Sequence, residues 1–321
     1  VMIWLSLLLE FKGMLVRQSK NTFIRCTERY GYITNQLTYH DRVYNSTGAD
    51  YLKVLSRIPQ NIEALIDELL KLYEDVSRDE LTADFIGFLN SLATDNFIVM
   101  GDSVEELDSK DLPFTYSMEN PKTMNFLHSQ DTCENVIENT QDFFLEEIQG
   151  RPLISSLQFE LSSRCNERCI HCYIPNEKKN TGFDMPTKKV LSIIDEFAAM
   201  GGIHVTLSGG EALLHKDIAE ICRYSRSKDL EITILSNLLN LKQSDIDVFK
   251  ETNVSLVQTS LYSMAPEVHD FITTIKGSFA KTKNAIELLV KNDIPVQMSC
   301  PIMKANQKGY VDVLNYAKSL K

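Results

Sequence analysis

Three cysteines lie within eight positions of the sequence, in the segment SSRCNERCIHCY. Cys165, Cys169 and Cys172 have the spacing CxxxCxxC, and a loop of this length can wrap around a cuboid iron–sulfur cluster. Three thiolates would hold three irons of a 4Fe–4S cluster and leave the fourth iron open to another ligand. A structural ferredoxin would supply a fourth cysteine, and none lies nearby, so the pattern indicates a catalytic cluster.

Zinc binding and chance both remain open as alternatives for this triad. Structural zinc could use His171 as a fourth ligand, although His171 adjoins Cys172 and would have difficulty reaching the same ion. The spacing could also be a chance cluster. The remaining cysteines are scattered, and ordinary core or surface thiols are expected at Cys26, Cys133, Cys222 and Cys300. Seven cysteines without a disulfide framework favour a reducing, cytoplasmic setting.

A second segment with chemical potential is LSGGEALLH, which contains Gly209, Gly210 and Glu211. Two adjacent glycines after a strand let a ligand approach the backbone closely, and the Glu211 carboxylate can bind an ammonium group. Alone this pattern is weak, because a Gly-Gly turn in front of a helix is common. It gains weight from its place, since it ends the predicted strand that follows the cysteine loop.

The sequence from residue 157 onward alternates between strand and helix patterns that would position both segments. Strands are expected at 157–161, 203–207, 231–235, 254–262 and 295–300. Helices are expected at 187–200, 214–227, 244–250, 278–292 and 309–320. Repeated βα units build a parallel sheet or barrel whose chemistry lies at the carboxyl ends of the strands. A complete eightfold barrel needs about 250 residues, so residues 151–321 predict an α/β fold that is a partial TIM-like barrel.

Residues 14–100 predict a smaller α+β domain with a winged-helix-like order of elements. Short strand patterns at 22–45 precede three helical patterns, and NFIVM at 96–100 predicts a closing strand. The helical segments are GADYLKVLSRI, capped by Ser46 or Thr47, then QNIEALIDELLKLY after Pro59, and RDELTADFIGFLNSLA, with a capping box of Ser77 and Glu80.

The charge of this domain argues against nucleic acid as its partner. The chain carries a net charge of −11, of which residues 1–150 account for −13 and residues 151–321 for +2. The third helix of a winged helix would enter the major groove, but here it carries three acidic residues against the single cation Arg78. Like charges repel phosphate, so no nucleic acid partner is expected, and the uneven charge supports two domains.

Two further segments are interpreted from their composition. Residues 1–13 begin with an apolar run of about ten residues, which is too short for a membrane span and lacks the flanks of a signal peptide. We therefore expect no membrane association and treat these residues as a non-structural extension before Met14. Residues 101–150 are acidic and weakly patterned, and they predict a linker with one helix around 134–148, ending near Pro152.

With CxxxCxxC after the first strand and Gly-Gly-Glu after the second, residues 151–321 resemble the radical S-adenosylmethionine (radical SAM) superfamily. The resemblance implies a 4Fe–4S cluster bound by Cys165, Cys169 and Cys172, with S-adenosylmethionine (SAM) chelating the open iron. It also implies a methionyl amine held by Gly209, Gly210 and Glu211. The family's chemistry would follow from these cofactors: reductive cleavage of SAM gives a 5′-deoxyadenosyl radical that abstracts hydrogen.

The resemblance implies contacts with SAM from three further places. Ser260, at the end of the fourth strand, would reach the ribose, although it could also be an ordinary strand-end serine. Ser236 with Asn237 would line the SAM pocket, and capping of the next helix is the alternative for this pair. Lys276, in TTIKGSF, lies where relatives often place a basic residue that contacts a carboxylate.

The first 100 residues resemble PqqD-like peptide-recognition domains, which bind a leader peptide by adding it as a strand to a sheet edge. Residues 260–296 resemble SPASM-type peptide maturases, whose auxiliary-cluster cysteines would lie beyond Lys321, so a truncated chain is expected. The implied function is modification of a ribosomally made precursor peptide by a thioether or carbon–carbon crosslink, with a reductant such as flavodoxin or ferredoxin. A sulfatase-type maturase, a heme-pathway relative and a non-catalytic peptide-binding protein remain alternatives.

Overall fold

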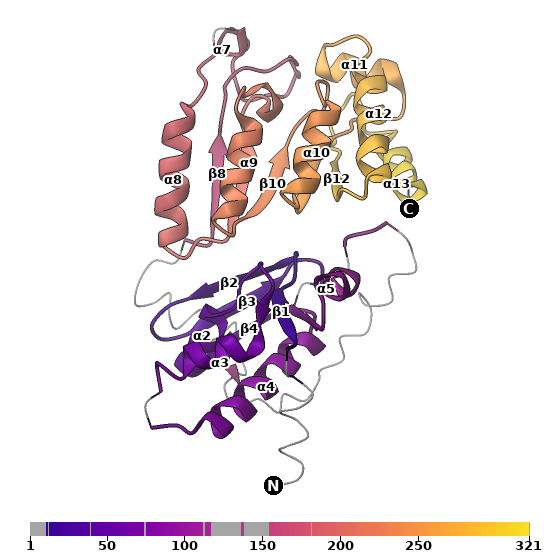
Figure 1. Cartoon of the computed structure of the whole chain (residues 1–321). Helices are drawn as coiled ribbons and strands as arrows, with labels where there is room; N and C mark the ends of the chain where they lie inside the picture. The colour runs from indigo at the N-terminus through magenta and orange to yellow at the C-terminus, as the bar shows by residue number, and fades with distance from the viewer. Residues whose placement is uncertain are drawn as a thin grey trace. The chain divides into compact units, whose positions relative to one another are not determined.

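The computed structural model describes residues 11, 13–38, 40–73, 75–111, 113–116, 136–137, 154–180 and 182–320. The chain divides into two compact units (Figure 1). The first unit is Val1–Pro113 with Pro121–Pro152, and the second is Phe114–Asn120 with Leu153–Lys321. No helix in the described part of the chain is long and apolar enough to cross a membrane.

Two antiparallel sheets form the first unit. One has the order β5-β1-β6, with strands Gln60–Asn61, Leu15–Gln18 and Ile98–Gly101. The other has the order β2-β3-β4-β7, with strands Thr22–Cys26, Gly31–Asn35, His40–Tyr44 and Val136–Ile137. The strand patterns within 22–45 are thus confirmed, and the closing strand is β6, which pairs with β1. The sequence did not indicate β1 or β5, because Leu15–Gln18 has two apolar residues followed by two polar ones and β5 has only two residues, so neither shows an alternating pattern.

Strand β7 corrects one expectation. The helix expected around 134–148 is wrong for Val136 and Ile137, which form a strand antiparallel to β4, with Val43 opposite Ile137. Two adjacent β-branched residues favour an extended backbone, and β4 offers its N–H and C=O groups for pairing along this edge. The rest of the expected helix lies outside the described residues.

Three helices lie between β4 and β6 in the sequence, with the bounds α2 Ser46–Lys53, α3 Ile62–Leu69 and α4 Arg78–Thr94. The capping box predicted for the third helix is confirmed, since the Ser77 and Glu80 side chains each accept from the other residue's backbone N–H. The cap expected at Ser46 or Thr47 is instead Asn45, whose side chain accepts from the N–H three residues later at 3.0 Å. From that position a short side-chain acceptor satisfies an N–H that would otherwise lack a partner.

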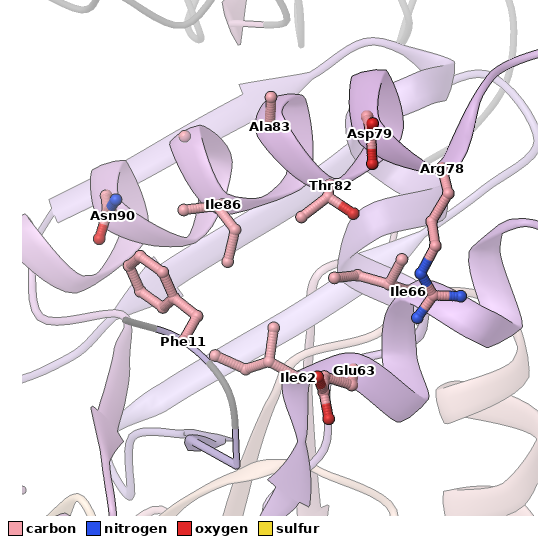
Figure 2. A pocket seen from close by; sticks show the side chains of 11 residues that line it. Phe11, Ile62, Glu63, Ile66, Arg78, Asp79, Thr82, Ala83, Ile86 and Asn90 are labelled. Carbon is pink, nitrogen blue, oxygen red and sulfur yellow. The ribbon is translucent and has the colours of Figure 1, made fainter. Parts of the chain in front are cut away.

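A cavity of about 300 Å³ lies between α3 and α4 in this unit. Figure 2 shows Ile62, Ile66 and Ile86 from the two helices around it, together with Phe11. Phe11 also packs against the hydrophobic core of the unit, so the expectation that residues 1–13 are non-structural is wrong at this position. Residues 1–10 and 12 lie outside the described part of the chain.

A further helix, α5 (Val104–Lys110), forms in the segment whose composition predicts a linker. Buried charges tie the end of this helix to β1, because the Arg17 guanidinium contacts Asp111 at 2.5 Å and Asp108 at 2.7 Å. The Ser19 hydroxyl also donates to Asp111 at 2.9 Å. The Asp111 side chain is fully buried whereas that of Asp108 is 59% exposed, so the first pair makes the stronger connection.

The second unit contains one five-stranded parallel sheet with the order β12-β11-β10-β9-β8. From β8 to β12 the strands are Ser156–Glu160, His204–Ser208, Glu231–Leu235, Leu256–Ser260 and Val296–Ser299. The main helices are α8 Thr187–Ala199, α9 Ile218–Ser227, α10 Gln243–Glu251, α12 Ser278–Lys291 and α13 Tyr310–Ser319 (Figure 1). The five predicted βα units are thus confirmed, with shifted ends. Three short helices were not predicted, namely α7 Asn176–Asn180, η2 Ala212–Leu214 and α11 Pro266–Thr273.

The hydrophobic core of this unit holds the strands in register, so that their carboxyl ends lie along one edge of the sheet. On α8, Val190, Ile194 and Phe197 recur at helical spacing and are buried in one cluster with strand residues such as Leu207. Burying each such side chain contributes about 1.5–3 kcal/mol. The register places the last residue of β8 opposite Ser208, the last residue of β9. The segments that follow these strands therefore start side by side.

Candidate cofactor site at the carboxyl edge of the parallel sheet

The cysteine loop after β8 is bonded directly to the Gly-Gly-Glu segment after β9. The Gly210 N–H donates to the Ser162 carbonyl at 2.5 Å, and the Glu211 N–H donates to the Arg164 carbonyl at 2.9 Å. A Cβ atom on Gly209 would lie 2.4 Å from the Ser162 oxygen, and one on Gly210 would lie 2.4 Å from the Arg164 oxygen. The two glycines therefore allow a close approach of backbone, as predicted, but the backbone that approaches belongs to the cysteine loop.

Asp184 clamps the start of the cysteine loop. It accepts from the Ser162 hydroxyl at 2.6 Å and from the Arg164 Nε at 2.9 Å, and a second guanidinium nitrogen completes the contact. Burial raises the pKa of Asp184, but the bonds from Arg164 and Ser162 lower it by more, so the net pKa lies below its usual value. Arg164 also donates to the Leu214 carbonyl at 2.9 Å, which links the cysteine loop to η2.

The middle of the cysteine loop is held by the end of α11 and by the residue that follows this helix. The Arg168 N–H donates to the Thr273 carbonyl at 3.0 Å, and the Ile170 N–H donates to the Ile272 carbonyl at 2.9 Å. The Thr274 hydroxyl donates to the Arg168 carbonyl at 3.2 Å. The loop thus has an anchor on each side, which fixes the backbone that carries the three thiols.

The three thiols are free and half-buried. The Cys169 thiol donates to the Glu167 carboxylate at 3.1 Å, and the Glu167 N–H lies 3.4 Å from the Cys165 sulfur. Burial raises the pKa of Cys165, and burial together with the Glu167 charge raises that of Cys169. Because a thiolate is the form that binds metal, a positive metal centre would have to offset this cost.

A zinc ion and an iron–sulfur cluster need different arrangements of ligands. Among the described residues, no three His, Cys, Asp or Glu side chains surround one position that could hold a metal ion. Tetrahedral zinc needs its ligands around one ion, whereas each thiolate of a 4Fe–4S cluster binds a different iron. His171, the alternative zinc ligand, makes an edge contact with the Tyr262 ring, with its Nε2 3.4 Å from the hydroxyl.

Glu211 is buried and already bonded within the chain. Its carboxylate accepts from the Ser236 hydroxyl at 2.6 Å, from the Asn237 N–H at 2.7 Å and from the Leu213 N–H at 2.9 Å. Burial raises its pKa, and these three bonds act in the opposite direction. A carboxylate has about four lone-pair sites, so these three bonds leave the Glu211 carboxylate able to accept from one more donor, such as an amine.

Ser236 and Asn237 support the site and do not cap the next helix, which begins only at Gln243. Beyond their bonds to Glu211, the Asn237 amide donates to the Asn166 side chain at 2.6 Å and lies 3.8 Å from the Cys165 sulfur. This connects the loop after β10 to the cysteine loop. Leu238, which sequence reasoning missed, holds a left-handed backbone (φ +64°) and donates its N–H to Ser236 at 2.9 Å.

The two remaining predicted residues differ in their surroundings. Ser260 ends β11 and is half-buried at the same edge of the sheet as the thiols, next to Tyr262. Burial and the nearby Cys169 raise the pKa of Tyr262. Lys276 lies exposed in the turn between α11 and α12. Ser260 therefore lies at the sheet edge that carries the cysteine loop, while Lys276 is exposed in the turn after α11.

Two buried charged residues beside the thiols were not identified from the sequence. Glu167 is 4% exposed, and burial raises its pKa to about 7. Lys179, on α7, is 2% exposed. Charged residues are rarely buried without a reason, but the segment CNERCIHCYIPNEKK is largely polar, so only the tertiary structure distinguishes these two residues from their exposed neighbours.

Comparison with known protein families agrees with this geometry. Residues 159–317 match the family model described as "Radical SAM superfamily", and residues 39–98 match "Coenzyme PQQ synthesis protein D (PqqD)". The chain therefore contains a radical SAM domain in its second unit and a PqqD domain in its first unit. Radical SAM proteins use a 4Fe–4S cluster and SAM, and the three thiols of the cysteine loop fit that cofactor.

The curated relatives include peptide-modifying proteins and a heme synthase. The chain is 29% identical over 164 residues to an AdoMet-dependent heme synthase of Methanosarcina barkeri, covering 51% of this chain and 47% of that protein. It is 28% identical over 170 residues to the subtilosin biosynthesis protein AlbA of Bacillus subtilis, covering 53% and 38%. It is 25% identical over 161 residues to a PqqA peptide cyclase of Methylocella silvestris, covering 50% and 43%. The chain spans about half the length of these relatives or less.

Among solved structures, the chain resembles Streptococcus suis SuiB bound to the precursor peptide SuiA. The TM-score is 0.58 at 13% sequence identity, and the match covers 95% of this chain and 61% of that one. A match at this identity shows a common fold. It extends over both units of the chain, so the combination of an antiparallel first unit with a parallel second unit has a known counterpart.

Proposed function

We propose that the protein is a radical SAM enzyme that modifies a ribosomally synthesised precursor peptide by forming a thioether or carbon–carbon crosslink. The proposal is carried by the cysteine loop bonded to the Gly-Gly-Glu segment, in a chain that also holds a PqqD domain. When bound, the reduced cluster and SAM supply a radical that removes hydrogen from an unactivated carbon. The protein's own residues then have to hold, orient and shield these groups.

Each residue of the site is proposed to bind a different part of the cluster or of SAM. The thiols of Cys165, Cys169 and Cys172 hold the cluster, on a loop fixed by its bonds to the neighbouring segments. Glu211 joins the ends of β9 and β10, and its remaining lone pair accepts from the methionyl amine of SAM. At the end of β11, Ser260 contacts the ribose, and Ser236 lines the pocket through its bond to Glu211. Lys276 is proposed as a carboxylate contact, although its exposure supports this role least.

The PqqD domain is proposed to bind the leader of the precursor peptide by strand addition. The fold of the first unit offers antiparallel sheet edges for this purpose, and on the β4 edge the chain's own β7 already makes this kind of pairing. The net charge of −13 in residues 1–150 favours a basic or neutral peptide over nucleic acid. A cytoplasmic reductant such as flavodoxin or ferredoxin would supply the electron.

The test is anaerobic reconstitution with iron and sulfide, followed by SAM and dithionite. A 4Fe–4S enzyme takes up about four iron and four sulfide per chain and releases 5′-deoxyadenosine and methionine. Replacing Cys165, Cys169 and Cys172 together by Ala should abolish iron uptake. Cys300→Ala is the matched control, because Cys300 is another free, half-buried thiol of the same unit. Retention of iron by the triple variant would refute the site.

The substrate class needs a second measurement. A candidate precursor peptide encoded beside this protein should bind to the chain, and turnover should remove two hydrogens from it for each crosslink, as seen by mass spectrometry. SAM cleavage that no peptide stimulates would favour a small-molecule enzyme such as the heme-pathway relatives. Peptide binding without any SAM cleavage would favour a binding protein that lacks a working catalytic unit.

A further inference from the structure

Lys179 is buried without a bonding partner. Its side chain lies on α7, just after the cysteine loop, and the residue is 2% exposed. Among the described residues, no group accepts a hydrogen bond from its Nζ. Burying an unpaired ammonium group costs several kcal/mol. A fold that keeps such a group inside therefore provides for an anion that the described side chains do not supply.

The surroundings of Lys179 show where that anion would lie. The charge of the ammonium acts on Cys165, Glu167 and His171, which belong to the cysteine loop. Burial raises the pKa of Cys165 and Glu167, and the Lys179 charge acts against that rise in both. Burial lowers the pKa of His171, and Lys179 lowers it further. The buried positive charge thus lies near the loop that carries the thiols.

The neighbouring carboxylates Glu167 and Glu211 make their hydrogen bonds with other groups. Glu167 accepts a hydrogen bond from the Cys169 thiol at 3.1 Å, and among the described residues it makes no hydrogen bond with Lys179. Glu211 is bonded to Ser236 and to two backbone N–H groups. The ammonium is therefore left for a group that arrives when the site is loaded.

We propose that Lys179 is a positioning residue whose ammonium group balances the negative charge of the iron–sulfur cluster held by the cysteine loop. This rests on the proposed function. A 4Fe–4S core bound by three thiolates carries one net negative charge, and two after it takes one electron. A fixed positive charge stabilises the doubly negative state more, so Lys179 makes the cluster easier to reduce.

The experiment compares Lys179→Met with Lys178→Met. Methionine has nearly the same length as lysine but no charge, and Lys178 is the exposed neighbour on the same helix. Both variants and the wild type are reconstituted anaerobically, iron is counted, and the cluster is titrated with dithionite while the reduced form is followed by electron paramagnetic resonance. Lys179→Met is expected to prefer the reduced state about tenfold less, which is a drop of about 59 mV for one electron. Lys178→Met is expected to match the wild type.

A second measurement uses the protein before reconstitution. Removing a buried unpaired charge should leave the apo protein as resistant to urea as the wild type, or more so. If apo Lys179→Met is less resistant, the ammonium already has a partner in the chain and the inference is wrong. This measurement on the apo protein also tests the inference if the Lys179→Met variant fails to bind iron.

The outcomes separate the inference from the proposed function. If the wild type takes up no cluster, both are wrong. If the wild type takes up a cluster and Lys179→Met has the same potential, only the role of Lys179 is refuted. An unchanged potential with weaker SAM binding would assign the ammonium to the SAM carboxylate and would equally overturn the inference.

Discussion

Replacing Gly210 by Ala tests whether the cysteine loop depends on the glycines beside it. The added methyl carbon would lie 2.4 Å from the Arg164 oxygen, where ordinary contacts begin at about 3.4 Å, so the two loops must separate by about 1 Å. The bonds from the Gly210 and Glu211 N–H groups to the cysteine loop would be lost or stretched. Each bond contributes about 1 kcal/mol and overpacking costs about 1–3 kcal/mol, so a cost of about 3–5 kcal/mol is expected.

The assay is hydrogen exchange of the apo protein, read on peptides that cover the cysteine loop and the Glu211 amide. A cost of about 3 kcal/mol in local opening corresponds to exchange that is about a hundredfold faster. The control is Gly201→Ala, because Gly201 has φ +85° but no atom within 4 Å of an added Cβ. That variant carries only backbone strain of about 1–2 kcal/mol, and its effect should remain near Gly201.

Two outcomes would contradict the role of the contact between Gly210 and the cysteine loop. Should Gly210→Ala exchange as slowly as the wild type in both segments, the contact between the loops does not hold the site together. If the apo protein opens as expected but iron uptake after reconstitution is unchanged, the contact stabilises the fold without contributing to the cluster site.

Three further predictions concern stability. Burial lowers the pKa of His269 from 6.5 to about 4, so as the pH falls the unfolded chain takes up this proton before the folded chain does. The free energy of unfolding should therefore fall by up to about 3 kcal/mol as the pH is lowered from 6.5 to 4. His269→Asn should flatten this part of the pH profile measured by urea unfolding. Asp111→Ala breaks a buried ion pair and should cost about 3–5 kcal/mol in urea unfolding of the first unit, whereas Asp108→Ala, at the exposed side of the same cation, should cost less than about 1 kcal/mol. If the two variants lose the same free energy of unfolding, burial does not explain the difference between the two ion pairs. Ser236→Ala removes one donor from a buried carboxylate and should cost about 1–3 kcal/mol; an unchanged urea midpoint would mean that Glu211 does not need this bond.

The order of elements in the second unit could be predicted because its strands and helices are regular. Strands such as β10 alternate buried apolar residues with partly exposed neighbours, and helices such as α8 repeat apolar residues at helical spacing, so local pattern and tertiary structure agree. The first unit was harder, since β1, β5 and β7 each have four residues or fewer and are defined by their partners. A two-residue strand such as Val136–Ile137 has no period of its own, and its pairing with β4 decides its conformation.

In the candidate site, too, some residues could be identified from the sequence and others only from the structure. Cys165, Cys169 and Cys172 could be identified from spacing, because metal ligands on one short loop leave a pattern in the sequence. Lys179 could not be identified, because Lys178 and Lys179 are adjacent and alike in sequence, and only the packing of α7 exposes one and buries the other.

The sequence by itself determined the chemical class of the second unit: three thiols at CxxxCxxC after one strand, two glycines and a glutamate after the next, and five βα units. These are local properties, since spacing and periodicity are fixed by neighbouring residues. Tertiary structure alone decided that Gly210 receives the backbone of the cysteine loop and that Glu211 is bonded across to the end of β10. Such contacts join residues far apart in the sequence, and burial, which decides the charges and pKa values of the site, exists only after the chain has packed.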